Sequence, residues 1–292
     1  MTRPYEMAEA PNLVRATCPV APTLTKHVYN WIVDADTLKT YLAGLPIPAL
    51  RYFDEISSTN DEALRWAEQG AADGSLVVAD RQTAGRGRMG RSWITQPGSA
   101  LAFSLVFKPL PQEMSRVQLF SPLGALGVAL ALERHYGLRP QVKWPNDVLL
   151  EQEKVCGVLA EASWSGEKLA GVVLGIGINV APTSVPPASQ LIYPATSLER
   201  SLRHAVNRFD VLKYVLADLF EWRRQLVDGS FIQAWQDRLA FKGERVHVEQ
   251  EGRPTIEGVV TGVMPDGRLA LQGLSGEEVD VRIGDVHLRL AD

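Results

Sequence analysis

The chain has 292 residues, of which 46% are hydrophobic and 22% charged, so it can bury the core of one large or two smaller globular domains. Its formal net charge of −4 excludes a protein-wide basic surface for nucleic acid or anionic lipid, and any anion-binding site must therefore be local. The two cysteines are far apart, which argues against a disulfide framework, and the five histidines are too scattered for a His/Cys zinc site. No apolar run reaches about 18 residues, which argues against a membrane span. These features favour a cytoplasmic globular protein.

The first 33 residues contain four prolines and no sustained hydrophobic period, which predicts a loosely ordered extension rather than the compact helices of a winged helix. After this extension, helix and strand signals alternate, and Thr59 and Glu62 are spaced as a capping box at a helix start. We predict helices over 36–42, from 58 onward, and over 115–136, 208–227 and 231–241. We predict strands over 51–56, 75–80, 99–108, 141–144, 147–150, 155–162 and 169–180, with one buried face on 99–108.

Short turns join the strands between 141 and 180, which implies antiparallel pairing and argues against a doubly wound parallel sheet. Residues 181–194 hold four prolines and are predicted to form a long mobile loop. From about residue 242 the pattern changes to short strands separated by glycine-rich turns, which is typical of a small β-barrel. We therefore predict an extension over 1–33, a catalytic domain over 34–241 and a small barrel domain over 242–292.

Three glycines in the segment 81–93, Gly85, Gly87 and Gly90, match the dinucleotide pattern GxGxxG. A dinucleotide loop opens directly into a helix, whereas Pro97 and a strand-like run follow here, so we reject that interpretation.

Three arginines, Arg86, Arg88 and Arg91, alternate with these glycines. Glycines let a backbone wrap closely around a ligand, and guanidinium groups bind carboxylate or phosphate oxygens bidentately. The segment therefore predicts a local anion site, with a solvated basic loop or a nucleic-acid contact as the alternatives.

Two further clusters carry polar residues and glycines at strand ends. Residues 142–148 form a strand, a sharp turn and a second strand, and Lys154 precedes Gly157 at the next strand start. Gly175 and Gly177 place bare backbone on one strand face, which close approach of a ligand requires, and Asn179 ends that strand. The alternatives are a packed turn for the first cluster and simple strand-end capping by Asn179.

Together these motifs resemble those of biotin–protein ligases. The matching motifs are Ser58-Thr59-Asn60, Gly85-Arg86-Gly87-Arg88, Lys143-Trp144-Pro145-Asn146-Asp147, Lys154-x-x-Gly157 and Gly175-x-Gly177-x-Asn179. Each is weak or moderate alone, but five in this order are specific, and the resemblance runs from about Asp34 to the C-terminus. It implies an α+β fold: a class II synthetase-like catalytic domain with a mixed, mainly antiparallel sheet flanked by helices, followed by a small SH3-like β-barrel.

The resemblance implies an ATP-dependent ligase that forms a carbon–nitrogen bond. The biotin carboxylate attacks the α-phosphate of ATP, giving biotinyl-5′-AMP and pyrophosphate, and a lysine of a biotin carboxyl carrier domain then displaces AMP. Biotin and ATP are thus expected as substrates, Mg²⁺ as the metal, and the carrier domain of a biotin-dependent carboxylase as the partner. A homodimer through a central sheet edge is compatible with the resemblance.

Site residues carry over by motif position. The biotin side is expected to comprise Ser58, Thr59, Asn60, Gln82, Gly85, Arg86, Gly87, Arg88, Lys154, Gly157 and Gly175. The ATP side is expected to comprise Arg86, Arg88, Trp93, Lys143 and Asn179, with Asp147 as a magnesium contact. Lys154 is the first choice for the catalytic residue, between the biotin carboxylate and the α-phosphate, with Arg88 in the loop that closes over the intermediate. We expect residues 84–91 to be mobile without biotin.

The chain departs from the family pattern at two points. Some relatives place a tryptophan after the Gly-x-Gly-x-Asn strand, over the adenine, whereas residues 181–194 offer only Tyr193 as an aromatic. Cys156 lies inside the lysine motif and is interpreted as a small buried hydrophobic residue.

Three other functions stay open at this point. A bifunctional relative would also repress transcription through an N-terminal winged helix, but the irregular first 33 residues favour a ligase without DNA binding. The lipoate and octanoyl ligases or transferases share the core fold. A non-enzymatic biotin-binding module would have no use for Arg86, Arg88 and Lys154.

Overall fold

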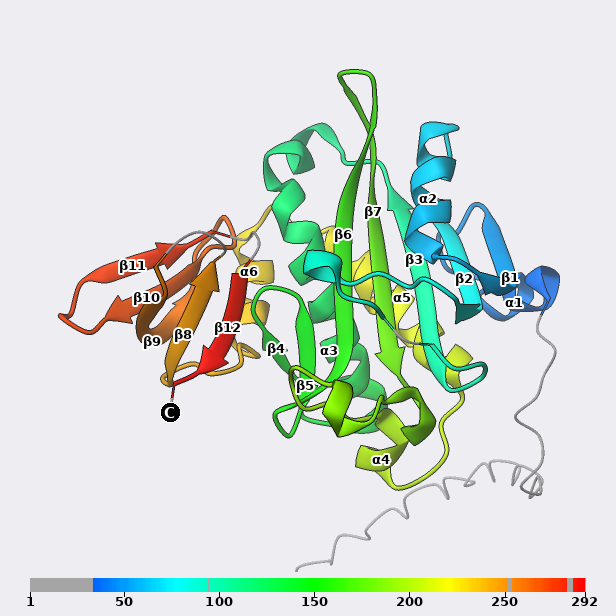
Figure 1. Cartoon of the computed structure of the whole chain (residues 1–292). Coiled ribbons are helices and arrows are strands. Elements are labelled where there is room, and N and C mark those ends of the chain that lie inside the picture. The colour runs from blue at the N-terminus through cyan, green and yellow to red at the C-terminus, as the bar shows by residue number, and fades with distance from the viewer. Residues whose placement is uncertain (1–33, 94, 251–253, 283–285, 292) are drawn as a thin grey trace, which may run out of the picture. The chain divides into compact units, whose positions relative to one another are not determined.

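The computed structural model describes residues 34–93, 95–250, 254–282 and 286–291 (Figure 1). The extension predicted over residues 1–33 lies outside this part of the chain. Within it, two sheets account for the strands: a seven-stranded sheet between residues 50 and 179 and a five-stranded sheet between residues 245 and 290.

The seven-stranded sheet has the order β1-β2-β3-β7-β6-β5-β4. Its strands are β1 (Leu50–Ile56), β2 (Ser75–Gln82), β3 (Ala100–Phe107), β4 (Gln141–Lys143), β5 (Asp147–Leu150), β6 (Glu153–Ser165) and β7 (Lys168–Asn179). Only the pair β1–β2 is parallel, and all the other pairs are antiparallel. The predicted mixed, mainly antiparallel sheet is therefore confirmed.

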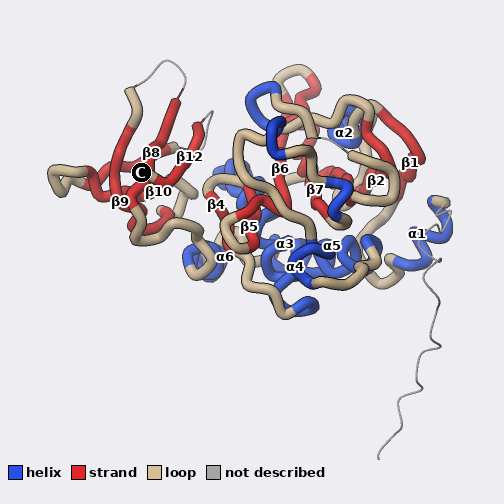
Figure 2. Tube along the Cα trace, turned by 60° about the horizontal axis from the view of Figure 1, so that its bottom comes forward, coloured by secondary structure: helices blue, strands red, loops and turns tan. Residues whose placement is uncertain are grey.

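Helices cover both faces of this sheet (Figure 2). The α-helices are α1 (Ala35–Tyr41), α2 (Thr59–Glu68), α3 (Phe120–Tyr136), α4 (Leu198–Leu202), α5 (Arg208–Arg223) and α6 (Gly229–Gln236). Short 3₁₀ segments are η1 (Arg88–Gly90), η2 (Pro111–Leu119), η3 (Pro182–Ser184) and η4 (Ala188–Gln190). The short helix α4 was not predicted, because its five residues are too few to show a period.

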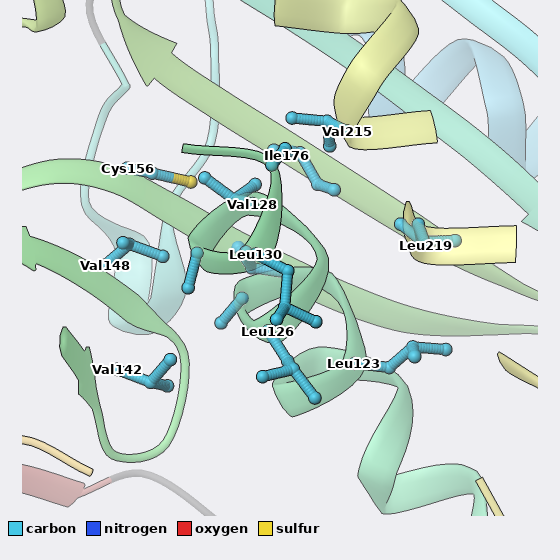
Figure 3. Packing of buried hydrophobic residues seen from close by; sticks show 14 of the residues in the cluster. Leu123, Leu126, Val128, Leu130, Val142, Val148, Cys156, Ile176, Val215 and Leu219 are labelled. Carbon is cyan, nitrogen blue, oxygen red and sulfur yellow. The ribbon is translucent and has the colours of Figure 1, made fainter. Parts of the chain in front are cut away.

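The two faces differ in the size of their cores. Helix α2 packs small side chains such as Ala63 and Ala67 onto Val106 and Val173 of the sheet. Helix α3 is buried on almost all sides, between the opposite face and α5 (Figure 3). This close packing depends on Gly124, where an added Cβ would lie 2.9 Å from Cγ1 of Val158.

Two local predictions were wrong. All eight residues of β3 are buried, not one face only, because helices cover both sides of this central strand. The N-cap of α2 is Ser58, whose hydroxyl accepts from the backbone N–H of Asp61, rather than Thr59. Thr59 is instead the first residue of the helix.

One helical stretch, Pro111–Tyr136, is long and apolar enough to cross a membrane by length and composition. Of its most apolar window, 72% is buried inside the described chain, as in the core helix of a globular domain. Its apolar character is therefore accounted for by packing against the sheet and α5.

The five-stranded sheet has the order β11-β10-β9-β8-β12, with every pair antiparallel. Its strands are β8 (Arg245–Gln250), β9 (Ile256–Val263), β10 (Leu269–Gly273), β11 (Glu278–Val281) and β12 (Val286–Leu290). The indole N–H of Trp144 donates to the carbonyl of Gly267 at 3.0 Å, and Arg116 donates to the carbonyl of Pro265 at 3.0 Å. The β9–β10 turn is thus bonded directly to the larger part of the chain.

Candidate active site

A cavity of about 450 Å³ opens beside the ends of β6 and β7. Its walls come from the start of α2, the end of β2, the β4–β5 turn, the start of β6, the loop after β7 and Leu288 of β12. The segment Gly85–Arg91, here called the glycine–arginine loop, folds back on itself through a bond from the Gly87 N–H to the Arg91 carbonyl and supplies another wall. Predicted site residues that line the cavity are Ser58, Thr59, Asn60, Gln82, Arg86, Gly87, Arg88, Trp93, Lys143, Asp147, Lys154, Gly157, Gly175 and Asn179.

Gly85 is the one predicted site residue that does not line the cavity. A Cβ at this position would lie 2.4 Å from the carbonyl oxygen of Trp93 and 2.8 Å from Nε2 of Gln82. The glycine therefore lets the loop pass close to β2, so its structural role is to allow packing.

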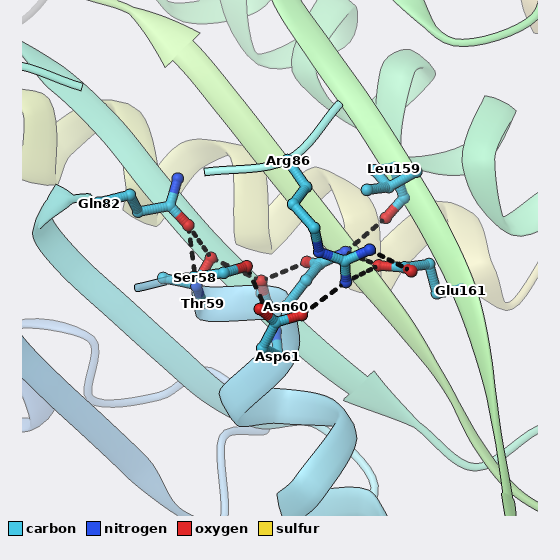
Figure 4. Close-up of polar contacts among 9 residues, drawn as sticks. Ser58, Thr59, Asn60, Asp61, Gln82, Arg86, Leu159 and Glu161 are labelled. Atoms are coloured by element: carbon cyan, nitrogen blue, oxygen red, sulfur yellow. Dashed lines mark hydrogen bonds and ion pairs between the residues drawn. The ribbon is translucent and has the colours of Figure 1, made fainter. Parts of the chain in front are cut away.

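A buried polar network forms one end of the cavity (Figure 4). The backbone N–H and the hydroxyl of Thr59 both donate to Oε1 of Gln82, at 2.8 and 3.0 Å. Asn60 accepts from the Ser104 hydroxyl at 2.6 Å and donates through Nδ2 to Glu161 at 2.8 Å. Thr59 and Asn60 are at most 5% exposed, so this end presents fixed hydrogen-bonding groups without needing a mobile side chain.

On the cavity face of β6 and β7, side chains from other segments pack directly over the glycines. A Cβ at Gly175 would lie 1.9 Å from Oδ1 of Asn60, and one at Gly177 would lie 2.3 Å from Cε2 of Trp93. The Trp93 ring also covers Gly157, at 3.1 Å from the equivalent Cβ position. The bare backbone expected at Gly175 and Gly177 is therefore covered by Asn60 and Trp93.

Cations gather at the other end of the cavity. Nζ of Lys154 lies 2.7 Å from Oδ1 of Asp147, and Nζ of Lys143 lies 3.7 Å from the centre of the Tyr193 ring. Burial lowers the pKa of Lys143 to about 8, while Asp147, its partner across β4 and β5, acts in the opposite direction. The loop arginine Arg88 donates to Oδ1 of Asn146 at 2.9 Å. This end is therefore an electropositive pocket in a protein of negative net charge.

Arg86 makes contacts that the sequence did not predict. Its two terminal nitrogens bind both oxygens of Glu161 at 2.8 Å, and one of them also lies 2.7 Å from Oδ1 of Asp61. Hydrogen bonding to Glu161, with attraction to both carboxylates, raises the pKa of Arg86 against the effect of burial. Sequence reasoning missed Glu161 and Asp61, although alternation along β6 puts Glu161 on the same face as Gly157.

Three further motif residues, Trp144, Asn179 and Cys156, make mainly structural contacts. Trp144 is 1% exposed and packs against the turn at Gly267, so its role is structural. Asn179 donates to the Thr196 carbonyl at 3.1 Å but still lines the cavity. Cys156 is fully buried, which raises the pKa of its thiol, and the interpretation as a small buried hydrophobic residue is confirmed.

Asp147 is the only acidic residue lining the cavity among the residues that the structure describes. No group of three or more His, Cys, Asp or Glu side chains suited to a metal occurs in that part of the chain. Mg²⁺ usually takes one or two protein carboxylates and completes its shell with water and substrate phosphates. A single carboxylate beside an electropositive pocket fits that type of site.

Comparison with known proteins agrees with this geometry. Residues 52–179 match the biotin/lipoate A/B protein ligase family, and residues 241–289 match the biotin protein ligase C-terminal domain. The chain is 37% identical over 243 residues to the bifunctional ligase/repressor BirA of Bacillus spizizenii, an alignment that covers 82% of this chain and 73% of that protein. It is 36% identical over 230 residues to the biotin–acetyl-CoA-carboxylase ligase of Paracoccus denitrificans, covering 76% and 93% of the two chains.

Solved structures give the same result. The biotin protein ligase of Aquifex aeolicus, in complex with biotin and ATP, superposes with a TM-score of 0.73 at 30% identity, over 84% of this chain and 100% of that one. The α+β fold, the cavity and both sequence matches lead to one conclusion: the chain belongs to the biotin protein ligase family.

Proposed function

We propose that the protein is an ATP-dependent ligase that attaches biotin to a lysine of a biotin carboxyl carrier domain through biotinyl-5′-AMP. The observation that carries the proposal is the division of one cavity into a neutral polar end and a cationic end. Along β7, Gly175 lies under Asn60 and Gly177 lies under Trp93. Two residues along a strand span about 6.6 Å, so the two ends are close enough for one ligand to reach both.

The neutral end suits the ureido ring of biotin. Its groups are the uncharged hydrogen-bonding side chains of Ser58, Thr59, Asn60 and Gln82, fixed by the buried network. An apolar stretch that includes Trp93 and Leu159 follows along the cavity wall and suits the aliphatic chain of biotin. The biotin carboxylate would then point toward the cationic end.

The cationic end suits the phosphates of ATP. A carboxylate and a triphosphate repel each other, and fixed cations offset this repulsion most effectively in a site that excludes water. Lys154 adjoins Trp93 and Gly157, so its ammonium can neutralise the charge that builds between the carboxylate and the α-phosphate. Arg88 and Lys143 would hold the remaining phosphate oxygens, with Trp93, Tyr193 and Asn179 on the nucleotide side.

Magnesium belongs to the same proposal. Asp147 would provide the protein ligand, and the ion would offset phosphate charge. Cys156 is buried with a raised thiol pKa, so it is unsuited to a covalent intermediate, and a bound adenylate needs none.

The proposal extends to the domain boundaries at 34–241 and 242–292, to action in the cytoplasm, and to a ligase that does not regulate transcription. The biotin protein ligase C-terminal domain match over 241–289 supports the boundary and favours biotin over lipoate. The net charge of −4 supports a function without DNA. Specific, salt-sensitive binding to the operator of a biotin operon would contradict the last point.

The test is biotin-dependent exchange of labelled pyrophosphate into ATP. The parent protein should catalyse it, and Lys154→Ala should slow it by about tenfold to a hundredfold, the loss expected for one charge-assisted contact. Lys168→Ala, which removes an exposed lysine from the β6–β7 hairpin, is the matched control and should keep full exchange. Absence of exchange in the folded parent protein would refute the proposed function, and undiminished exchange in Lys154→Ala would remove this residue from the mechanism.

A further inference from the structure

Glu161 connects three segments that build the cavity, although it does not line the cavity itself (Figure 4). It lies on β6, and its carboxylate binds the guanidinium of Arg86 through two bonds of 2.8 Å. The same carboxylate accepts from Nδ2 of Asn60 on α2 at 2.8 Å. One side chain thus joins β6, the glycine–arginine loop and the start of α2.

The guanidinium of Arg86 is largely committed to this cluster. It has five N–H groups, of which two bind Glu161 and a third faces Asp61 at 2.7 Å. Both terminal nitrogens, which form the fork that would otherwise hold a carboxylate or phosphate, are occupied by protein carboxylates. Two negative charges also face one positive charge, so this cluster offers no net attraction to an anion.

The other cations of the cavity have different partners. Lys154 faces one carboxylate, Asp147, and Lys143 lies over the Tyr193 ring. Arg88, from the same loop as Arg86, donates to the neutral amide of Asn146. Arg86 and Arg88 lie two residues apart, and Arg86 is the one whose two terminal nitrogens are both bound to the Glu161 carboxylate.

We propose that Glu161 is a positioning residue that holds Arg86, and through it the glycine–arginine loop, in place over the cavity before biotin binds. Arg86 then acts as a structural brace, and binding of the carboxylate and phosphates falls to Arg88, Lys143 and Lys154. The same carboxylate fixes the amide of Asn60, whose oxygen accepts from Ser104, so that Asn60 keeps one orientation at the neutral end. This inference rests on the proposed function for its ligand, but not for its account of the loop.

The test compares Glu161→Gln with Glu55→Gln. Glutamine keeps the size of the side chain and an oxygen that can accept from Asn60, but it loses the charge that holds Arg86. Glu55 forms an exposed pair with Arg81 at 2.6 Å, so Glu55→Gln removes an arginine–glutamate pair away from the cavity. Asp61→Asn removes only the second carboxylate and should give a smaller effect than Glu161→Gln.

Two measurements are made on each variant. The first is the rate of tryptic cleavage after Arg86, Arg88 and Arg91 in the protein without ligand, which should rise about tenfold in Glu161→Gln and stay unchanged in Glu55→Gln. The second is calorimetric biotin affinity without ATP, which should fall about tenfold, together with the kinetics of adenylate formation. In those kinetics the KM for biotin should rise while kcat at saturating biotin stays within about twofold of the parent value, because ligand binding restores the loop.

Three results would decide against the inference or its basis. Cleavage and affinity equal to those of Glu55→Gln would overturn the positioning role. Tighter biotin binding by Glu161→Gln would overturn it as well, because Glu161 would then compete with the ligand for Arg86. If Glu161→Gln is cleaved faster than the parent protein but the parent protein itself binds no biotin, the positioning of the loop is supported and the proposed function is refuted.

Discussion

Replacing Gly175 by alanine should damage the neutral end of the cavity by displacing Asn60. The added Cβ would lie 1.9 Å from Oδ1 of Asn60, 2.7 Å from its Cγ and 2.9 Å from its Nδ2. Real Cβ atoms do not approach heavy atoms so closely, and neither β7 nor α2 can move easily inside a packed sheet. The amide of Asn60 must therefore leave its position.

The cost can be estimated from the contacts that Asn60 makes. Its amide donates to the Glu161 carboxylate at 2.8 Å and to the Leu159 carbonyl at 3.3 Å, and it accepts from the Ser104 hydroxyl at 2.6 Å. A bond to a charged group contributes about 2 kcal/mol and each of the two neutral bonds about 1 kcal/mol, so the free energy of unfolding should fall by about 4 kcal/mol. Biotin affinity should fall by at least about tenfold, because the same amide belongs to the proposed ureido site.

The assay is a double-mutant cycle with Asn60→Ala. The free energy of unfolding is measured by urea denaturation, and biotin affinity by calorimetry, for both single variants and the double variant. With the amide already removed, alanine at position 175 has no clash to cause and should cost less than about 1 kcal/mol. If Gly175→Ala costs the same with and without Asn60, the amide is not the source of the damage and the reasoning fails.

Two other predictions concern the cationic end. Arg88→Gly removes the bond to Asn146 and a cation over the cavity, so biotinyl-5′-AMP formed by the variant should escape into solution. Rapid gel filtration measures how much adenylate stays bound, and retention equal to that of the parent protein would contradict this role. Burial lowers the pKa of Lys143 to about 8 from its ordinary 10.5. Between these pH values the lysine is neutral in the folded protein but still protonated in the unfolded chain, so the folded state becomes more stable as pH rises. The free energy of unfolding of the parent protein should therefore rise relative to Lys143→Met by up to about 3 kcal/mol between pH 8 and 10.5, and a constant difference in urea denaturation would contradict the shift.

Patterns that depend on local chemistry were predictable from the sequence. Short turns between the strands from Gln141 to Asn179 required antiparallel pairing, and the sheet has it. The cations and glycines of the motifs do converge on one cavity, because several strand ends meet there. The short C-terminal strands also begin at Arg245, close to the predicted change of pattern near residue 242, since glycine-rich turns separate them.

Features that depend on tertiary contacts were not predictable. The full burial of β3 follows from helices on both faces, which the alternation of its own residues does not show. The pairing of Arg86 with Glu161 joins residues 75 positions apart, and a single sequence does not reveal such a contact. Likewise, Gly175 and Gly177 were interpreted as a bare surface for a ligand, whereas their closest neighbours are Asn60 and Trp93.

The bond between Trp144 and the β9–β10 turn has a consequence for how the chain can be divided. Trp144 follows Lys143 directly, and its indole is 1% exposed and donates to the carbonyl of Gly267. The backbone of Val142 is also bonded to Arg238 and Ala240, just before the predicted boundary at residue 241. A protein cut at that boundary would leave the indole N–H without this acceptor, beside the lysine that is proposed to hold phosphate. The proposed boundary near residue 241 therefore separates two sheets but not two independent sites, because the C-terminal sheet also supplies Leu288 to the wall of the cavity.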